Sequence, residues 1–173
     1  IELFRAVEQA LGKREIIAED LGYMSETVRQ LVRDSGFPGM KVLEFAFDSR
    51  EPSDYLPHRY TRDCVCYTGT HDNAPLGQWL EEAKPEDVAY AKGYLGLSQE
   101  EGQIWGVIRG GMGSVSDLFI AQMQDYLELG AEARMNFPGT LSNNNWTWRA
   151  QDGMITDALA HRIRELTRLF DRI

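Results

Sequence analysis

The chain has 173 residues, 43% of them hydrophobic and 26% charged, which is typical of a water-soluble globular domain. Its net charge of −9 argues against a nucleic-acid partner, because binding to phosphates requires clustered lysines and arginines. It holds no apolar run of the roughly 20 residues that a membrane-spanning helix needs. No linker or repeat divides it, so we expect one folded unit over residues 1–173 with no internal boundary.

The first third of the chain alternates between helical and strand patterns. Residues 4–11 have the helical period, and residues 15–19 form a short apolar run that predicts a strand buried on both faces. Ser25 is a typical N-cap for the next helix, and Gly36 is a typical residue to end it.

Two further strands are expected in the middle of the chain. Residues 40–47 predict one strand, with Leu43, Phe45 and Phe47 on the same face. Residues 64–68 predict the other, which ends in a Gly-Thr-His-Asp-Asn sequence. Between them lies a long stretch rich in turn residues.

The last part of the chain reads as helices around a fourth strand. Pro85 is placed to open a helix, and Ser98 with Glu101 predicts a capping box for the helix that Gly110–Gly113 would end. Residues 118–123 suit a strand, and residues 159–173 have the apolar spacing of an amphipathic helix. About four strands alternating with helices predict an α/β fold with a parallel sheet. The periodicity leaves open whether the sheet is open or half of an eight-stranded barrel.

The two cysteines, Cys64 and Cys66, are two positions apart, so on a strand both side chains point to one face. Two cysteines make a poor disulfide framework, and no further metal ligand lies near them in the sequence. We therefore expect buried, reduced thiols and a cytoplasmic location.

Three expected strands end in carboxylates, namely Glu19-Asp20, His71-Asp72-Asn73 and Gln124-Asp125. In parallel α/β proteins, catalytic side chains gather at the carboxyl ends of the strands, although each acidic residue could instead cap the next helix. A carboxylate-rich site suits either glycoside chemistry or a divalent metal. Because His71 is the only histidine near these carboxylates, we expect neither a metal nor another cofactor.

Two loops near the end of the chain combine amides with aromatic rings, Asn136-Phe137-Pro138-Gly139 and Asn143 to Arg149. Sugar rings stack on aromatic side chains, and their hydroxyls pair with asparagine, aspartate, histidine and arginine. The alternative is that Trp146 and Trp148 simply pack into the core.

Together these segments resemble glycoside hydrolase family 77, the amylomaltase or disproportionating-enzyme family of 4-α-glucanotransferases. The resemblance lies in five blocks in the family's order: Ile17-Ala18-Glu19-Asp20-Leu21-Gly22, Pro38 to Phe47, Tyr67-Thr68-Gly69-Thr70-His71-Asp72-Asn73, Glu132-Ala133-Arg134-Met135-Asn136 with Pro138-Gly139, and Asn145-Trp146-Thr147-Trp148-Arg149. It extends almost from end to end of the chain.

The resemblance implies a (β/α)₈ barrel, of which this chain would be the C-terminal half, and retaining transfer of α-1,4-glucan segments between maltooligosaccharides. Position by position, Glu19 is the implied general acid/base and Asp72 the carboxylate that stabilises the transition state. The implied contacts to substrate are listed here: His71, Phe45 near the acceptor, Asn136, Asp20, Asn73 and Trp146.

One family motif, the Arg-Ile-Asp-His-x-Arg-Gly sequence that carries the nucleophilic aspartate, does not occur in residues 1–173. Together with a start at Ile1 instead of methionine, this predicts a piece of a longer protein that is inactive alone. We expect it to self-associate or to pair with the missing N-terminal half. The alternatives are an amylase-like α-glucan hydrolase and a non-catalytic glucan-binding or assembly fragment.

Overall fold

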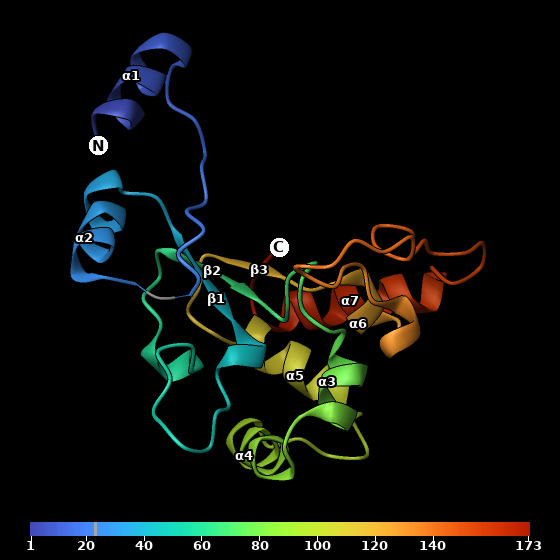
Figure 1. Ribbon diagram of the computed structural model, residues 1–173. Coiled ribbons are helices and arrows are strands. Elements are labelled where there is room, and N and C mark those ends of the chain that lie inside the picture. Colours follow the sequence, from blue (N-terminus) through green and yellow to red (C-terminus); the bar gives the residue numbers. More distant parts are fainter. Residues whose placement is uncertain (23) are drawn as a thin grey trace.

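Three parallel strands form the centre of the structure, in the order β1, β2, β3 (Figure 1). The computed structural model describes residues 1–22 and 24–173, and its strands are β1 Gly39–Val42, β2 Cys64–Tyr67 and β3 Leu118–Ile120. Gly39 lies opposite Cys64, and Val65 lies opposite Leu118. The parallel α/β class predicted from the sequence is confirmed, with three strands in this sheet where four were expected.

The strand expected over residues 15–19 is the one that the sheet does not contain. Ala18 forms a single parallel bridge to Gly39, and its N–H donates to the Pro38 carbonyl at 2.9 Å. Ile17 is exposed, so the stretch is not buried on both faces. A strand is stabilised by a partner along its length, whereas β1 contacts this stretch at one position. The prediction of a buried strand here is therefore wrong.

The strand expected over residues 40–47 is shorter than its apolar run. After Val42 the chain turns into a 3-10 helix, η1 Leu43–Phe45. In a 3-10 helix, side chains point to the same side every three residues, whereas in a strand they do so every two residues. As a result Leu43 and Phe47 are buried while Phe45 is 42% exposed, and the three do not share a face as predicted.

β3 also ends early, at Ile120, because the following residues form a short helix, α6 Met123–Tyr126. On β3, Leu118 and Ile120 are 52% and 42% exposed. Since β3 stands at the end of the strand order, its outer side offers backbone groups and apolar side chains to a further chain segment.

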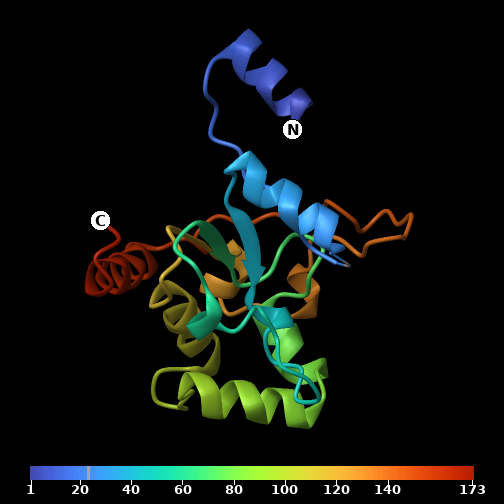
Figure 2. The same ribbon diagram turned by 90° about the vertical axis from the view of Figure 1, so that its left-hand side faces the viewer.

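The limits of the first two helices follow signals in the sequence. α1 Glu2–Leu11 ends at Gly12, and α2 Glu26–Ser35 begins where Ser25 Oγ accepts from the Val28 N–H at 3.3 Å. Gly36 ends α2 in the left-handed conformation, which glycine adopts without steric cost. α1 lies at the opposite end of the molecule from α4 Pro85–Leu95 (Figure 2).

Three helices follow β2: α3 Leu76–Glu82, α4 as expected from Pro85, and α5 Gln103–Met112. α3 was not predicted from the sequence. Ser98 Oγ accepts from the Glu101 N–H at 3.2 Å, but the residue before α5 is Gly102, so this bond closes a turn ahead of the helix. The predicted capping box is therefore misplaced.

α5 packs closely against the sheet, and glycine permits this. A β-carbon at Gly111 would overlap the ring of Phe119 and approach the Leu43 side chain, within 3 Å of Cδ1. Gly110 and Gly111 therefore lie inside α5 as packing positions, and Gly113 caps it. Of the glycine-rich stretch, only the last residue marks the helix end that was predicted.

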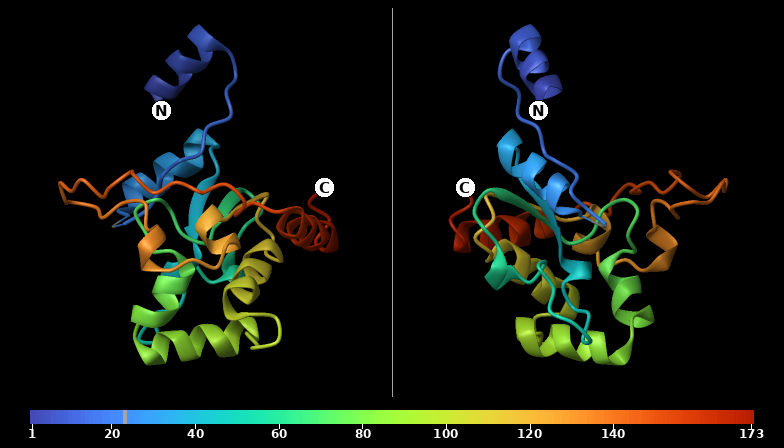
Figure 3. Two further views of the ribbon diagram at one scale, coloured as in Figure 1. Left: turned by 90° about the vertical axis from the view of Figure 1, so that its right-hand side faces the viewer. Right: turned by 60° about the vertical axis from the view of Figure 1, so that its left-hand side comes forward.

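The remaining elements are the 3-10 helices η2 Pro57–Arg59 and η3 Ala131–Ala133 and the terminal helix α7 Asp157–Leu169. A long loop between η3 and α7 extends away from the sheet (Figure 3). Among the described residues, no helix has the length and apolar character needed to cross a membrane.

The core lies between the sheet and α4 and α5, and it includes Phe47, Trp105 and Ile108. Cys64 and Cys66 are buried there as free thiols, as predicted. Burial raises the pKa of Cys64 to about 11 and that of Cys66 to about 12, so both stay protonated at neutral pH.

Candidate active site

The candidate site lies at the carboxyl end of the sheet, where β1 leads into η1 and β2 leads into a loop over residues 68–76. Because the strands are parallel, these ends meet at the same edge. The Glu44 N–H donates to the Thr68 carbonyl at 3.3 Å, and the Thr68 N–H donates to the Ile120 carbonyl at 3.1 Å. The pairing of the sheet thus continues just past the strands and sets where the loop begins.

The 68–76 loop is shaped by its own polar side chains. Asn73 Oδ1 accepts from the N–H and the hydroxyl of Thr70, at 2.9 and 2.8 Å. Thr70 Oγ1 accepts in turn from the Asp72 N–H at 3.3 Å. The turn presents His71 and Asp72 at its tip, and Asn73, a predicted substrate contact, has its carbonyl oxygen engaged in forming it.

Four of the predicted site residues come together at this tip. The Asn136 side-chain amide donates to Asp72 Oδ1 at 2.6 Å, and His71 Nε2 lies 3.5 Å from the same oxygen. The His71 ring also packs on the indole of Trp146, with ring centroids 5.0 Å apart. We call these four residues the Asp72 cluster.

Trp146 is held in an unusual backbone conformation, with a φ of 64°. Such a conformation costs a non-glycine residue of the order of 1 kcal/mol and needs compensation. Here the Trp146 N–H donates to the Met135 carbonyl at 2.7 Å and the ring packs on His71. Its side chain is 61% exposed, which rejects the alternative that Trp146 packs into the core.

Arg134 supports the Asp72 cluster, although it was not predicted as a site residue. Its guanidinium donates to the Asp72 carbonyl and to the Asn136 carbonyl, both at 3.0 Å, and lies 4.2 Å above the Phe137 ring. One side chain thus joins the two segments that carry the cluster. Its place two residues before Asn136, in the block Glu132-Ala133-Arg134-Met135-Asn136, was the available signal.

Glu19 and Asp20 lie on the stretch beside β1. Asp20 Oδ1 accepts from the Met40 N–H at 2.7 Å, which ties this stretch to the sheet. Glu19 is exposed, and within the described residues its side chain forms no hydrogen bond or ion pair with the Asp72 cluster. Among the described residues, the structure therefore joins four of the eight predicted site residues through direct contacts, and Glu19 is not one of the four.

Phe45 lies on a cavity of about 470 Å³ at the end of β1. Its ring meets Tyr55 edge to face at 5.6 Å, and Trp79 also lines the cavity. Aromatic rings together with the carboxyl groups of Glu44 and Asp54 offer both kinds of contact that a sugar needs.

Two carboxyl groups, half-buried Glu44 and fully buried Asp125, lie behind the loop. Burial, and next to it the charge of Asp125, raises the pKa of Glu44 well above its ordinary value, while Arg134 opposes this. Burial also raises the pKa of Asp125 to about 6. One oxygen of Glu44, Oε1, is shielded from solvent and has no hydrogen-bond partner among the described residues. Glu44 was not predicted as a site residue; Asp125 was noted only as a carboxylate after a strand.

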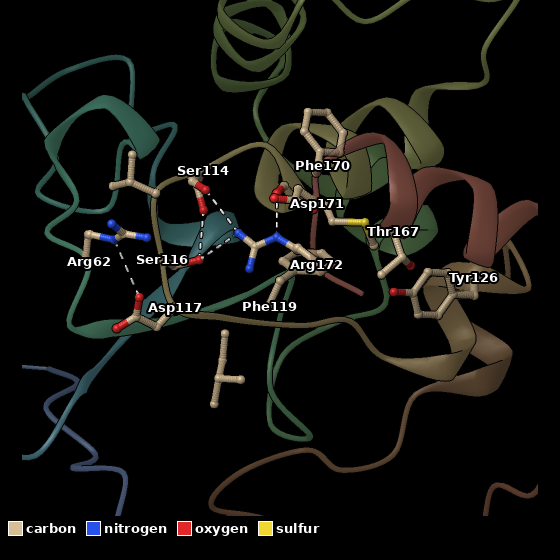
Figure 4. A pocket seen from close by; sticks show the side chains of 13 residues that line it. Arg62, Ser114, Ser116, Asp117, Phe119, Tyr126, Thr167, Phe170, Asp171 and Arg172 are labelled. Carbon is tan, nitrogen blue, oxygen red and sulfur yellow. Dashed lines mark hydrogen bonds and ion pairs between the residues drawn. The ribbon is translucent and has the colours of Figure 1, made fainter.

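A larger cavity of about 640 Å³ lies elsewhere, between the start of β3 and the end of α7 (Figure 4). Arg172 spans it and donates to the Met112 and Ser114 carbonyls at 2.7 and 3.0 Å, and Arg62 faces Asp117 at 3.8 Å. Because this cavity lies at the amino end of β3, it is at the opposite end of the strands from the Asp72 cluster.

The sequence profile of the glycoside hydrolase 77 family, described as 4-alpha-glucanotransferase, matches residues 1–156. The chain belongs to this family. A 4-alpha-glucanotransferase of Clostridium butyricum is 47% identical over 173 residues, which are 99% of this chain and 35% of that protein. A chloroplastic or amyloplastic 4-alpha-glucanotransferase of Solanum tuberosum is 40% identical over 174 residues, covering 99% of this chain and 30% of the relative.

Among solved structures, the amylomaltase of Streptococcus agalactiae in complex with acarbose superimposes with a TM-score of 0.92 at 38% identity, over 98% of this chain and 34% of that one. The amylomaltase of Corynebacterium glutamicum, at 19% identity and a TM-score of 0.67, shows the same fold. The chain spans about a third of the length of the relatives it matches. Its α/β fold with a parallel sheet fits a part of the barrel of these enzymes.

Proposed function

We propose that residues 1–173 form the C-terminal half of the (β/α)₈ catalytic barrel of a cytoplasmic 4-α-glucanotransferase. The complete enzyme transfers α-1,4-glucan segments between maltooligosaccharides with retention of configuration. The observation that carries this proposal is the Asp72 cluster, in which a carboxylate, an amide, an imidazole and an exposed indole meet at the carboxyl end of parallel strands.

Asp72 is the carboxylate that stabilises the transition state. Asn136 occupies its Oδ1 at 2.6 Å, which leaves Oδ2 to accept a hydrogen bond from a hydroxyl of the sugar being cleaved. His71 binds the same sugar through its ring nitrogen, and Trp146 offers a face on which a sugar ring stacks. These contacts catalyse by strengthening as positive charge develops on the sugar ring.

Glu19 acts as general acid and then as general base. In the first step it gives its proton to the glycosidic oxygen, while an aspartate outside residues 1–173 attacks the anomeric carbon and the bond to the leaving glucan breaks. In the second step, ionised Glu19 takes the proton from the 4-hydroxyl of an acceptor glucan. That oxygen attacks the anomeric carbon and releases the aspartate.

The acceptor binds over the aromatic cavity that contains Phe45 and Tyr55. Transfer rather than hydrolysis requires that a glucan outcompete water for the covalent intermediate, and stacking on these rings favours the glucan. Asp20 and Asn73 complete the substrate contacts through the atoms that their structural hydrogen bonds leave available.

The rest of the barrel pairs with the edges of this sheet. Leu118 and Ile120 on β3 and Ile17 beside β1 are exposed apolar side chains at the two edges, and their burial would reward closure. The partner in this pairing is the N-terminal half of the same enzyme, in preference to a second copy of this chain.

Incubation with maltotriose tests the proposal. We expect no products from residues 1–173 alone, and glucose together with maltopentaose and longer glucans from a chain of the relatives' full length. In that longer chain, Glu19→Gln should lower the rate by at least about 100-fold, which is the usual contribution of general acid–base catalysis. Asp72→Asn should also inactivate, whereas Glu100→Gln, on an exposed turn, is the matched control.

Three results would contradict the proposal. Products longer than maltotriose from residues 1–173 alone would mean that another carboxylate attacks. Glucose without longer products from the full-length protein would identify a hydrolase. Retention of maltooligosaccharides without turnover by the full-length protein would identify a binding protein.

A further inference from the structure

We propose that Asp125 is a positioning residue that clamps both ends of the 68–76 loop and thereby sets the position of His71 and Asp72. This inference rests on the proposed function, because the loop carries two of its site residues. Asp125 itself does not touch substrate in this proposal. Its side chain is fully buried, with 0% of its surface exposed.

The two oxygens of Asp125 bind the two ends of the loop. Oδ2 accepts from the Thr68 hydroxyl at 2.6 Å, and Oδ1 accepts from the Leu76 N–H at 2.7 Å. Thr68 directly follows β2, and Leu76 is the first residue of α3. One carboxylate therefore fixes the end of a strand to the start of a helix, and the intervening turn has both of its ends held.

The residues just before Asp125 add to the same clamp. The Gln122 N–H donates to Thr68 Oγ1 at 3.4 Å, and the Gln122 side-chain amide donates to the Ala74 carbonyl at 3.3 Å. Gln122, just before α6, and Asp125, within it, thus hold the loop at three points, Thr68, Ala74 and Leu76. These contacts join positions about 50 residues apart in sequence, so they are made only in the folded protein.

The charge on Asp125 strengthens the clamp. At neutral pH the carboxylate is ionised, since its pKa is raised only to about 6, and hydrogen bonds to an ionised acceptor are stronger than those between neutral groups. The ionisable groups that face it are Glu44 from η1 and Tyr126 from α6. A buried charge persists because donors surround it, so a side chain that cannot bind these donors is not tolerated here.

The exposed side of the loop is held separately. Arg134 binds the Asp72 carbonyl and Asn136 binds its side chain, as described above. Asp72 is therefore fixed between a buried anchor and an exposed one. A displacement of about 1 Å in a reacting group can cost about 100-fold in rate. Loss of the buried anchor should therefore reduce turnover more than substrate affinity.

The test uses the full-length protein and steady-state transfer from maltotriose, at a temperature well below unfolding. The variants are Asp125→Ala, Asp125→Asn, Thr68→Val and the Asp125→Ala/Thr68→Val double variant. Val107→Ala is the matched control, since Val107 is buried in α5 outside the site and its truncation only destabilises. Melting temperature is measured for every variant.

We expect Asp125→Ala to lower kcat by at least about 10-fold with KM within about threefold of the original. Thr68→Val should lower kcat by less, and the double variant should be no slower than Asp125→Ala, because both changes remove the same hydrogen bond. Asp125→Asn should recover most of the kcat. Its amide oxygen can still accept from Leu76, and its NH₂ group can donate to Thr68 Oγ1. Val107→Ala should keep its kcat.

The proposal fails if Asp125→Ala and Thr68→Val keep kcat within about twofold, or if their effects multiply in the double variant. It also fails if the kcat of Val107→Ala falls in proportion to the decrease in its melting temperature, since the loss of kcat in the other variants would then come from lower stability. Should Asp125→Ala not fold, Thr68→Val and Asp125→Asn still decide the matter. Glu19→Gln and Asp72→Asn are measured alongside. The proposed function requires both of these variants to be inactive, so their activities show whether a failure concerns Asp125 alone or the proposed function as well.

Discussion

The buried carboxyl group of Asp125 predicts how the stability of the protein depends on pH. Burial raises its pKa from 3.8 to about 6, so the folded state holds the proton more tightly than the unfolded state does. Its contribution to stability is therefore fully present below about pH 4 and is lost as the pH rises through 6. The difference between the two pKa values corresponds to about 3 kcal/mol.

Asp125→Asn removes this titration while keeping the size and shape of the side chain. We expect the free energy of unfolding of the original protein, relative to that of Asp125→Asn, to fall by about 2.4 kcal/mol between pH 4 and pH 7. Guanidinium denaturation followed by circular dichroism at half-unit pH steps measures this difference directly.

Glu44→Gln serves as the control, because Glu44 is the neighbouring carboxyl group and its pKa is also raised. That variant should lose the contribution of Glu44 together with its charge interaction with Asp125, and keep the part of the Asp125 contribution that comes from burial. A constant difference between the original protein and Asp125→Asn across this pH range would refute the reasoning. It would show that Asp125 has similar proton affinities in the folded and unfolded states.

Three further predictions concern stability, each measured by chemical denaturation. Phe47→Ala should lower the free energy of unfolding by about 3–5 kcal/mol, because the ring is buried among aromatic side chains; a loss below 1 kcal/mol would contradict this. Ser25→Ala should cost about 1 kcal/mol through loss of the cap on α2, and Ser25→Asp should restore it. Gly111→Ala should destabilise despite the higher helix propensity of alanine, since its methyl group would displace Phe119 and Leu43; a more stable variant would show that α5 can move.

Local signals in the sequence were enough for several features of the fold. Ser25 and Gly36 predicted the ends of α2, because capping depends on residues within one helical turn. Residues 64–68 predicted β2, and the i, i+2 spacing of Cys64 and Cys66 predicted that both thiols are buried together. The motif that ends in His71, Asp72 and Asn73 indicated where polar side chains gather.

The prediction was wrong where the pairing or burial of a residue depends on a partner that is distant in the sequence. The run at residues 15–19 is compatible with a strand, but β1 pairs with it at Ala18 alone, so the rest stays outside the sheet. Phe45 has the spacing of a buried strand residue, yet the chain bends into η1 and exposes it. The periodicity of a segment indicates which secondary structure it is compatible with, whereas its pairing and bending depend on the segments packed beside it.

The sequence by itself determined the family, the parallel α/β class and the residue types of the candidate site, because motifs, caps and strand patterns are properties of short segments. Only the tertiary structure decided that Asn136 binds Asp72 across 64 positions and that Asp125 reaches Thr68 across 57. It also decided which carboxyl groups are buried, and thus whose pKa is raised. Hydrogen bonds between distant residues and desolvation exist only after the chain has folded, and no local pattern encodes them.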